Sequence, residues 1–229
     1  TPTVMARVLV FDVNETLLDL SALDAPFQQV FGHAAARHEW FAQVLRSALV
    51  TTVAGPYADF SAVGRAALQM VAARRGVRLS TDEKTTIFDA MRRLPPHPDV
   101  VESLERLREG GWRLAALSNG APDVLQDQLA HAELSDFFDA ILSADAVRRL
   151  KPAPEPYHYA AQALGVEIGE VCMVAAHAWD VHGAMRAGAQ AAFVARPGKV
   201  LDPLGPAPAV VGPDLRQVAG QILEVDEAK

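Results

Sequence analysis

Short apolar runs that recur along the 229-residue chain constrain its fold more than any other feature. Each run is flanked by a helix-like segment, which is typical of a buried strand in a parallel sheet. The runs cover residues 7–11, 113–117, 171–175 and 191–194, with a last short one at 209–211. Strands that alternate with helices predict an α/β fold, a Rossmann-like parallel sheet with crossover helices. In such a sheet, ligands bind beyond the carboxyl ends of the strands.

Residues 21–93 follow a different pattern, without a convincing strand. Their apolar side chains recur at helical spacing, and the clearest series are Trp40, Val44, Ala48 and Val63, Ala67, Met70. Ser80 opens a typical helix start, and the proline-rich segment 94–98 ends the helical pattern. We therefore predict a helical cap domain over residues 21–93, inserted after the first strand. Residues 1–20 and 94–229 would form the catalytic core, with a last helix near 214–223.

Composition and charge exclude several classes of protein. A formal net charge of −7 at pH 7 disfavours a nucleic-acid partner held through its phosphates and offers no basic surface to a membrane. The sequence lacks a long apolar segment and a signal-peptide pattern, so we expect a cytoplasmic protein. Its single cysteine, Cys172, lies in an apolar run and is expected to be a buried thiol. We expect a small-molecule substrate as the partner, and a homodimer is left open.

Asp12 directly follows the first predicted strand. A carboxylate at this position points into the crevice beyond the sheet and can act as a nucleophile that forms a covalent intermediate. Thr16 carries a hydroxyl in the following turn, where it can bind and orient Asp12. An aspartate after a strand is as often a helix N-cap, so Asp12 alone leaves both interpretations open.

Three further segments carry polar side chains at or near strand ends. Ser118 and Asn119 suit the recognition of an anionic group, although they can equally cap a helix. Lys151 and Tyr157 lie in a proline-rich frame that fixes where the lysine points, with a solvated lysine as the alternative. Asp180 follows a later strand and can pair with Lys151. No nucleotide-binding or Cys/His metal motif accompanies them, so we expect neither a cofactor nor a metal site.

Together these features resemble the haloacid dehalogenase superfamily. Its ordered motifs match Asp12-x-x-x-Thr16, Ser118-Asn119, Lys151 and Asp180, which span the chain. The resemblance implies a Rossmann-like core, a helical cap and an aspartate nucleophile.

Position 14 and two short runs select a branch of this superfamily. Its phosphatases carry a second aspartate two residues after the nucleophile as general acid, whereas this chain has Asn14. The runs 151–157 and 178–180 are similar to the type II L-2-haloacid dehalogenases. This resemblance implies that Asp12 displaces halide from C2 of a short 2-haloacid. Water would then open the ester and release a 2-hydroxy acid, without a metal ion.

The resemblance also implies roles for the neighbouring residues. Lys151 and Ser118 would hold the substrate carboxylate or the nucleophile, and Asn119 would lie beside the halide. Asp180 would hold Lys151. The remaining substrate-binding candidates are Asn14, Tyr157 and an arginine from the cap that covers the halide, Arg37 before Arg46.

Two positions depart from the branch. Its members commonly have Ser and Asn where this chain has Ala175 and His177. An imidazole titrates near neutral pH, so His177 can position the hydrolytic water and also accept its proton. The alternative is that His177 only packs or caps the helix that follows.

Two other functions stay open from the sequence. A Mg²⁺-dependent phosphatase of the same superfamily would use the same Asp12, but Asn14 removes its general acid. A non-catalytic relative would serve as a binding module, and the presence of Asp12, Lys151 and Asp180 argues against it.

Overall fold

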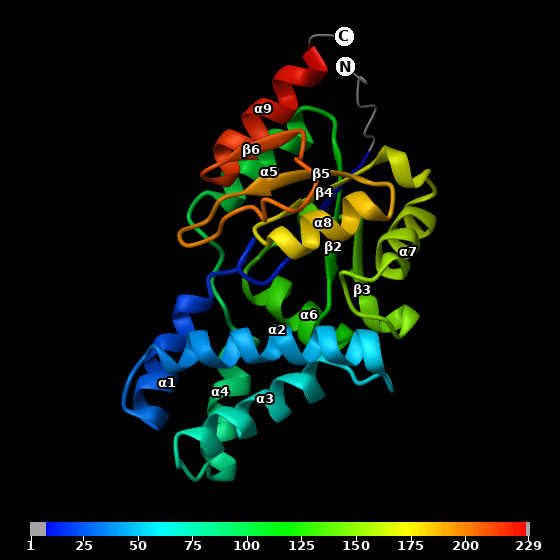
Figure 1. The fold of residues 1–229 in the computed structure, drawn as a ribbon. Coiled ribbons are helices and arrows are strands. Elements are labelled where there is room, and N and C mark those ends of the chain that lie inside the picture. The colour runs from blue at the N-terminus through cyan, green and yellow to red at the C-terminus, as the bar shows by residue number, and fades with distance from the viewer. Residues whose placement is uncertain (1–7, 228–229) are drawn as a thin grey trace.

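A parallel sheet forms the centre of the computed structural model, which describes residues 8–227 (Figure 1). Its strands lie in the order β3–β2–β1–β4–β5–β6, and each pairs in parallel with its neighbours, so the predicted α/β fold is confirmed. Residue 7, predicted to begin the first strand, lies outside the described residues. The strands are β1 (Val8–Phe11), β2 (Arg113–Ser118), β3 (Ala140–Ser143), β4 (Val171–Ala175), β5 (Gln190–Val194) and β6 (Val210–Gly212).

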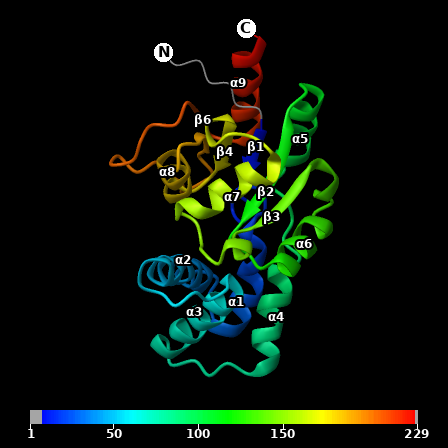
Figure 2. The same ribbon diagram turned by 90° about the vertical axis from the view of Figure 1, so that its right-hand side faces the viewer.

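Helices cover both faces of the sheet because successive side chains of a strand point to opposite sides. Leu9 and Phe11 belong to the hydrophobic core beneath α5 (Val100–Glu109), α6 (Pro122–His131) and α9 (Leu215–Glu227). Val8 and Val10 belong to the core beneath α7 (Pro154–Leu164) and α8 (Ala178–Arg186). Figure 2 shows α5 and α6 on one side of the sheet and α8 on the other.

Strand β3 is absent from the sequence prediction. It lies at one edge of the sheet, and its first two residues are only partly buried. An edge strand this short carries neither the continuous apolar run nor the alternation by which strands are recognised. The predicted strand at 209–211 is β6, displaced by one residue, and Cys172 in β4 is buried as expected.

Four consecutive helices form a layer beside the carboxyl ends of the strands (Figure 1). They are α1 (Asp24–Phe31), α2 (Ala36–Ala54), α3 (Phe60–Arg74) and α4 (Thr81–Met91). These helices fall within the predicted cap, although its limits at 21 and 93 stay a prediction. We call this layer the cap.

The cap helices begin and pack largely as their sequence predicts. Ser80 caps α4 in a capping box with Glu83, and the indole of Trp40 donates to the carbonyl of Gly64 at 3.0 Å, which joins α2 to α3. Met70 was expected on the buried face of α3 but is 45% exposed. The buried row instead continues to Val71, four residues after Ala67. Within residues 8–227 we find no helix with the length and hydropathy of a bilayer span.

The buried side chain of Arg196 joins three segments that are distant in sequence. Its guanidinium donates to both carboxylate oxygens of Asp99 at 2.8 and 2.7 Å. It also donates to the carbonyl of Thr16 at 2.9 and 3.2 Å. Asp99 in turn accepts the backbone N–H of Leu215, the first residue of α9, at 2.6 Å. Arg196 therefore links the loop after β5 both to the turn after β1 and to the segment before α5.

We predict that Arg196→Met lowers the free energy of unfolding by about 3–5 kcal/mol, because it leaves the carboxylate of Asp99 buried without its partner. Arg216→Met is the matched control, since Arg216 pairs with Glu102 at the surface, and it should leave the free energy of unfolding close to that of the wild type. Urea denaturation of both variants measures the difference. Equal losses of stability would contradict the structural role of Arg196.

Candidate active site

Asp12 lies where β1 ends, at the edge of the sheet that faces the cap. Phe11 is level with Ala116 of β2 and Val174 of β4, so three strand ends meet at this point. The carboxylate is only 5% exposed. Its Oδ2 atom accepts the hydroxyl of Thr16 at 2.7 Å, as the sequence led us to expect of this pair.

Thr16 also fixes the neighbouring strand. Its Oγ1 atom accepts the backbone N–H of Ala176 at 2.9 Å while donating to Asp12. The turn from Val13 to Leu18 is closed by backbone bonds from Leu17 and Leu18 to the carbonyl of Val13. Thr16 therefore holds Asp12 in one orientation and holds the ends of β1 and β4 together.

Lys151 is completely buried and uses its ammonium group to bind three oxygens. The Nζ atom donates to Asp12 Oδ1 at 3.0 Å, to Asp180 Oδ2 at 2.6 Å and to the carbonyl of Leu117 at 3.0 Å. Asn119 holds the main chain of this lysine from both sides: its Oδ1 accepts the N–H of Lys151 at 2.7 Å and its Nδ2 donates to the carbonyl at 3.2 Å. The proline-rich frame thus directs Lys151 inward, and the solvated alternative is wrong.

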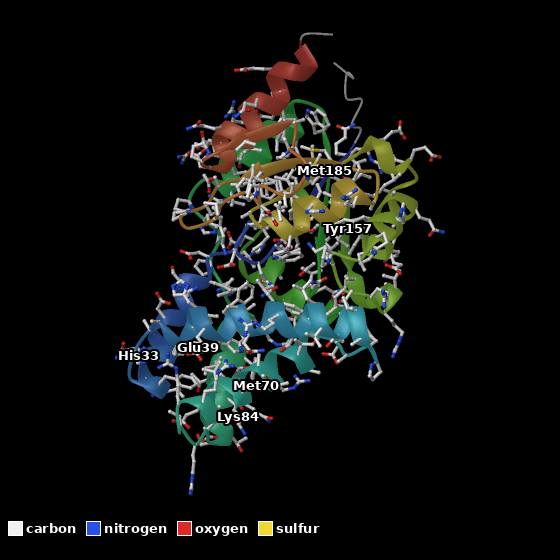
Figure 3. The ribbon with its side chains drawn as sticks, viewed as in Figure 1. His33, Glu39, Met70, Lys84, Tyr157 and Met185 are labelled. Carbon is white, nitrogen blue, oxygen red and sulfur yellow. The ribbon has the colours of Figure 1, made fainter. Side chains whose placement is uncertain are left out.

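Tyr157 lies behind this network rather than beside Asp12. Its hydroxyl donates to Asp180 Oδ1 at 2.6 Å, and its ring is buried in the core, where Figure 3 labels it. Burial and the charge of Asp180 raise the pKa of Tyr157 well above its usual value, so the hydroxyl remains a donor. Tyr157, which the sequence analysis lists as a substrate contact, does not line the cavity at Asp12.

The charged groups of the site keep Asp12 ionised and Lys151 protonated. Burial alone would raise the pKa of Asp12, but the charge of Lys151 and hydrogen bonds with His177 and Thr16 hold that pKa well below its usual range. Burial alone would lower the pKa of Lys151, yet the charges of Asp12 and Asp180 raise it. The carboxylate of Asp12 is therefore ionised and the ammonium is charged at neutral pH.

His177 lies between Asp12 and a second carboxylate. Its Nδ1 atom is 3.2 Å from Asp12 Oδ2, and its Nε2 atom is 2.8 Å from Glu15 Oε2. Lys199 also donates to Glu15 Oε2. Burial alone would lower the pKa of His177, but its hydrogen bonds to Asp12 and Glu15 raise it.

Glu15 is a charged residue of the site that the sequence prediction misses. Its only signal is its place in the turn between Asp12 and Thr16, where its backbone adopts a left-handed φ of 64°. Burial alone would raise the pKa of Glu15, but His177 and Lys199 lower it to about 2. Glu15 is therefore a second fixed negative charge beside the imidazole.

A small, mostly apolar cavity borders Asp12. Its volume of about 10 Å³ gives space for about one water molecule. It shares Asn14, Phe41 and Phe60 with an adjoining cavity of about 80 Å³. The residues that line the smaller cavity are Asp12, Asn14, Phe41, Leu45, Phe60, Ser118, Asn119, His177 and Trp179. The predicted candidates Asn14, Ser118 and Asn119 are thus brought to Asp12.

Arg37 and Arg46 do not line this cavity, although one of them is predicted to reach a ligand at Asp12. Arg37 is buried, and its Nε atom donates to Asp24 at 2.6 Å. Arg46 is exposed on α2. The same helix instead presents Phe41 and Leu45 to the cavity.

The side chains around Asp12 decide whether a divalent metal ion fits beside it. Among residues 8–227, no group of three His, Cys, Asp or Glu side chains is placed to hold one. Asp180 already binds Lys151 and Tyr157 through its two oxygens. Glu15 binds His177 and Lys199. The carboxylates near Asp12 are thus engaged with cationic or hydroxyl partners and do not fit a Mg²⁺ site.

An ionised aspartate fixed at the end of the first strand, beside a helical cap, suits an enzyme with an α/β fold and a carboxylate nucleophile. The chain belongs to the haloacid dehalogenase-like hydrolases, whose family model matches residues 6–188. The resemblance inferred from the motifs is therefore confirmed.

Characterised relatives and a solved structure are similar to most of the chain. It is 36% identical to an (S)-2-haloacid dehalogenase of Xanthobacter autotrophicus, over 84% of this chain and 76% of that protein. It is 34% identical to (S)-2-haloacid dehalogenase 4A of Burkholderia cepacia, over 84% of each. The structure of the L-2-haloacid dehalogenase from Xanthobacter autotrophicus with chloropropionic acid covalently bound superposes with a TM-score of 0.89. That match has 30% identity and covers 95% of this chain and 98% of the other.

Proposed function

We propose that this protein hydrolyses short 2-haloacids to 2-hydroxy acids through an ester on Asp12, without a metal ion. The observation that carries the proposal is the state of Asp12, an ionised carboxylate fixed by Thr16 and Lys151 at the wall of a mostly apolar cavity. A covalently bound chloropropionic acid in the similar Xanthobacter structure supports the same chemistry.

In the first step, a carboxylate oxygen of Asp12 attacks C2 of the substrate and the carbon–halogen bond breaks. Halide leaves as an anion and needs no proton, so Asn14 at the position of the phosphatase acid is no handicap. Apolar side chains around the cavity, Phe41, Phe60 and Trp179 among them, shield the reacting carboxylate from bulk solvent.

Ser118 and Asn119 are the proposed contacts for the substrate. The hydroxyl of Ser118 accepts the backbone N–H of Gly120 at 3.0 Å, which leaves its proton for the substrate carboxylate. Asn119 uses one amide hydrogen for the main chain of Lys151, and its second can meet the leaving halide. Arg37 has no role in this proposal, because its guanidinium forms an ion pair with Asp24.

In the second step, water attacks the carboxyl carbon of the Asp12 ester. His177 is the proposed general base, because its Nδ1 atom lies 3.2 Å from Asp12 Oδ2 and its ring lines the same cavity. In this proposal His177 positions the hydrolytic water, as the asparagine common at this position in the branch would, and it also accepts the proton of that water.

We predict that the protein releases halide from short (S)-2-haloacids such as 2-chloropropionate, at the same rate with and without EDTA. Asp12→Asn should release none, and Asp136→Asn, at an exposed aspartate, should match the wild type. Ion-selective measurement of halide across a panel of 2-haloacids tests this. Activity that acts on phosphate esters, vanishes with EDTA and returns with Mg²⁺ would contradict the proposal.

We further predict that His177→Ala gives a burst of halide followed by slow turnover, because only the second step needs the base. Turnover should fall by about 10²–10⁴-fold, the usual contribution of a positioned base. His177→Asn should recover part of this loss by positioning the water. Rapid-quench measurements separate the phases, and a slowed burst, or no change in either phase, would rule out the base role.

A further inference from the structure

The backbone of Glu15 adopts a conformation that disfavours its side chain. Its φ of 64° lies in the left-handed region, which is uncommon for any residue other than glycine. The turn imposes this conformation, since the N–H of Glu15 donates to the carbonyl of Leu18 at 2.9 Å. Glycine would adopt it without strain. Glu133 and Arg148 share this conformation, so what sets Glu15 apart is the group that its carboxylate contacts.

That carboxylate binds the far side of the proposed base. Glu15 Oε2 is 2.8 Å from Nε2 of His177, while Nδ1 of the same ring faces Asp12. The ring also stacks on Trp179, with centroids 5.2 Å apart and planes inclined by 26°. The imidazole is therefore fixed at both nitrogens and at one face.

We propose that Glu15 is the positioning residue of a nucleophile–base–carboxylate triad, Asp12–His177–Glu15, that acts when the ester is hydrolysed. The inference rests on the proposed function. In such a triad the third group holds the base in one tautomer and stabilises the imidazolium that forms. Here Glu15 keeps a proton on Nε2, so the neutral ring presents its Nδ1 lone pair toward the carboxyl group of Asp12.

The charge of Asp12 changes during the reaction, and this change sets the state of the base. In the free enzyme, the carboxylates of Asp12 and Glu15 both favour the protonated form of the buried imidazole, because their hydrogen bonds and charges raise the pKa of His177. Ester formation consumes the charge of Asp12. The pKa of His177 then falls, and the Nδ1 proton is released to solvent. The base therefore loses its proton more readily once the ester has formed.

Hydrolysis restores the starting state with all atoms accounted for. The water oxygen bonds to the carboxyl carbon of Asp12 and gives one proton to Nδ1 of His177. The bond from that carbon to the product oxygen then breaks, and the product oxygen takes the second water proton. Asp12 is again a carboxylate and His177 again an imidazolium. Each turnover thus releases one halide and one proton.

Lys199 keeps the triad carboxylate ionised at the edge of the solvent. It donates to Glu15 Oε2, and both side chains line a cavity of about 350 Å³ that Asp12 does not line. Four charged groups therefore surround His177: Asp12 and Glu15 bind it directly, and Lys151 and Lys199 each pair with one of these. Of these groups, only Asp12 loses its charge during turnover.

The first experiment measures both chemical steps in Glu15→Gln as a function of pH. The halide burst should match the wild type, and the steady-state rate should fall by about 10²-fold, the lower end of what a positioned base contributes. The acid limb of the turnover profile should move to lower pH, because the imidazole loses the charge that holds its proton. A merely structural residue would not move this midpoint. An unchanged rate and midpoint, or a smaller burst, would overturn the proposal.

Glu15→Gly separates the role of the side chain from folding. It relieves the left-handed backbone, so its melting temperature should equal or exceed that of the wild type while turnover falls as in Glu15→Gln. Glu133→Gly is the matched control, since Glu133 is an exposed glutamate with a φ of 56°, and it should keep full turnover. Full turnover in Glu15→Gly would overturn the proposal.

A readout without substrate tests the triad apart from the dehalogenase activity. In protein labelled with ¹⁵N-histidine, the His177 signals are assigned by their loss in His177→Ala. The pKa of His177 should lie above its ordinary value and should fall in both Glu15→Gln and Asp12→Asn. An unchanged pKa in Glu15→Gln would overturn the triad even if halide is released. If the pKa falls but no 2-haloacid is hydrolysed, the proposed function fails while the hydrogen-bonded triad stands.

Discussion

The ammonium group of Lys151 lies between two buried carboxylates, and the site depends on this arrangement. Desolvating a lysine and two aspartates is costly, and such a group is tolerated when each charge has partners with good geometry. Lys151 meets this condition, since it donates to Asp12, to Asp180 and to the carbonyl of Leu117. Tyr157 satisfies the remaining oxygen of Asp180. The result is an aspartate that stays ionised in an apolar cavity, as a carboxylate nucleophile requires.

The fold supplies rigid support for this network from several strands. Thr16 connects Asp12 to the backbone of Ala176, and Asn119 holds the main chain of Lys151. Arg196 binds the carbonyl of Thr16 and thereby ties the turn after β1 to the loop after β5. A nucleophile held this way loses little freedom when it reacts, which favours attack at a fixed carbon.

The sequence predicts those parts of the site that follow from short local patterns. A polar residue at the end of an apolar strand reaches the same edge of a parallel sheet whatever the details of packing, so Asp12 and Ser118 could be placed together. Asp180, in the first turn of the helix that follows β4, reaches the same edge. The direction of the Lys151 side chain could be predicted for a similar reason, because the prolines around it restrict the local backbone. The parallel sheet and the helices of the cap followed from hydrophobic periodicity.

Other features depend on packing or on a single backbone angle and could not be predicted. The rotation of α2 about its axis decides whether Arg37 or Phe41 faces Asp12, and that rotation is set by contacts with the rest of the cap. The direction of Glu15 depends on one left-handed φ. Tyr157 was assigned to the substrate although its hydroxyl is used by Asp180 inside the core.

Oxygen labelling in a single turnover tests most directly whether Asp12 is the nucleophile. With enzyme in excess over a 2-haloacid in H₂¹⁸O, the oxygen transferred to the product comes from the original Asp12 carboxylate. The account predicts an unlabelled 2-hydroxy acid and ¹⁸O in the peptide that contains Asp12, both read by mass spectrometry. Label in the first product, with none in that peptide, would mean that water attacks the substrate directly and would contradict the account.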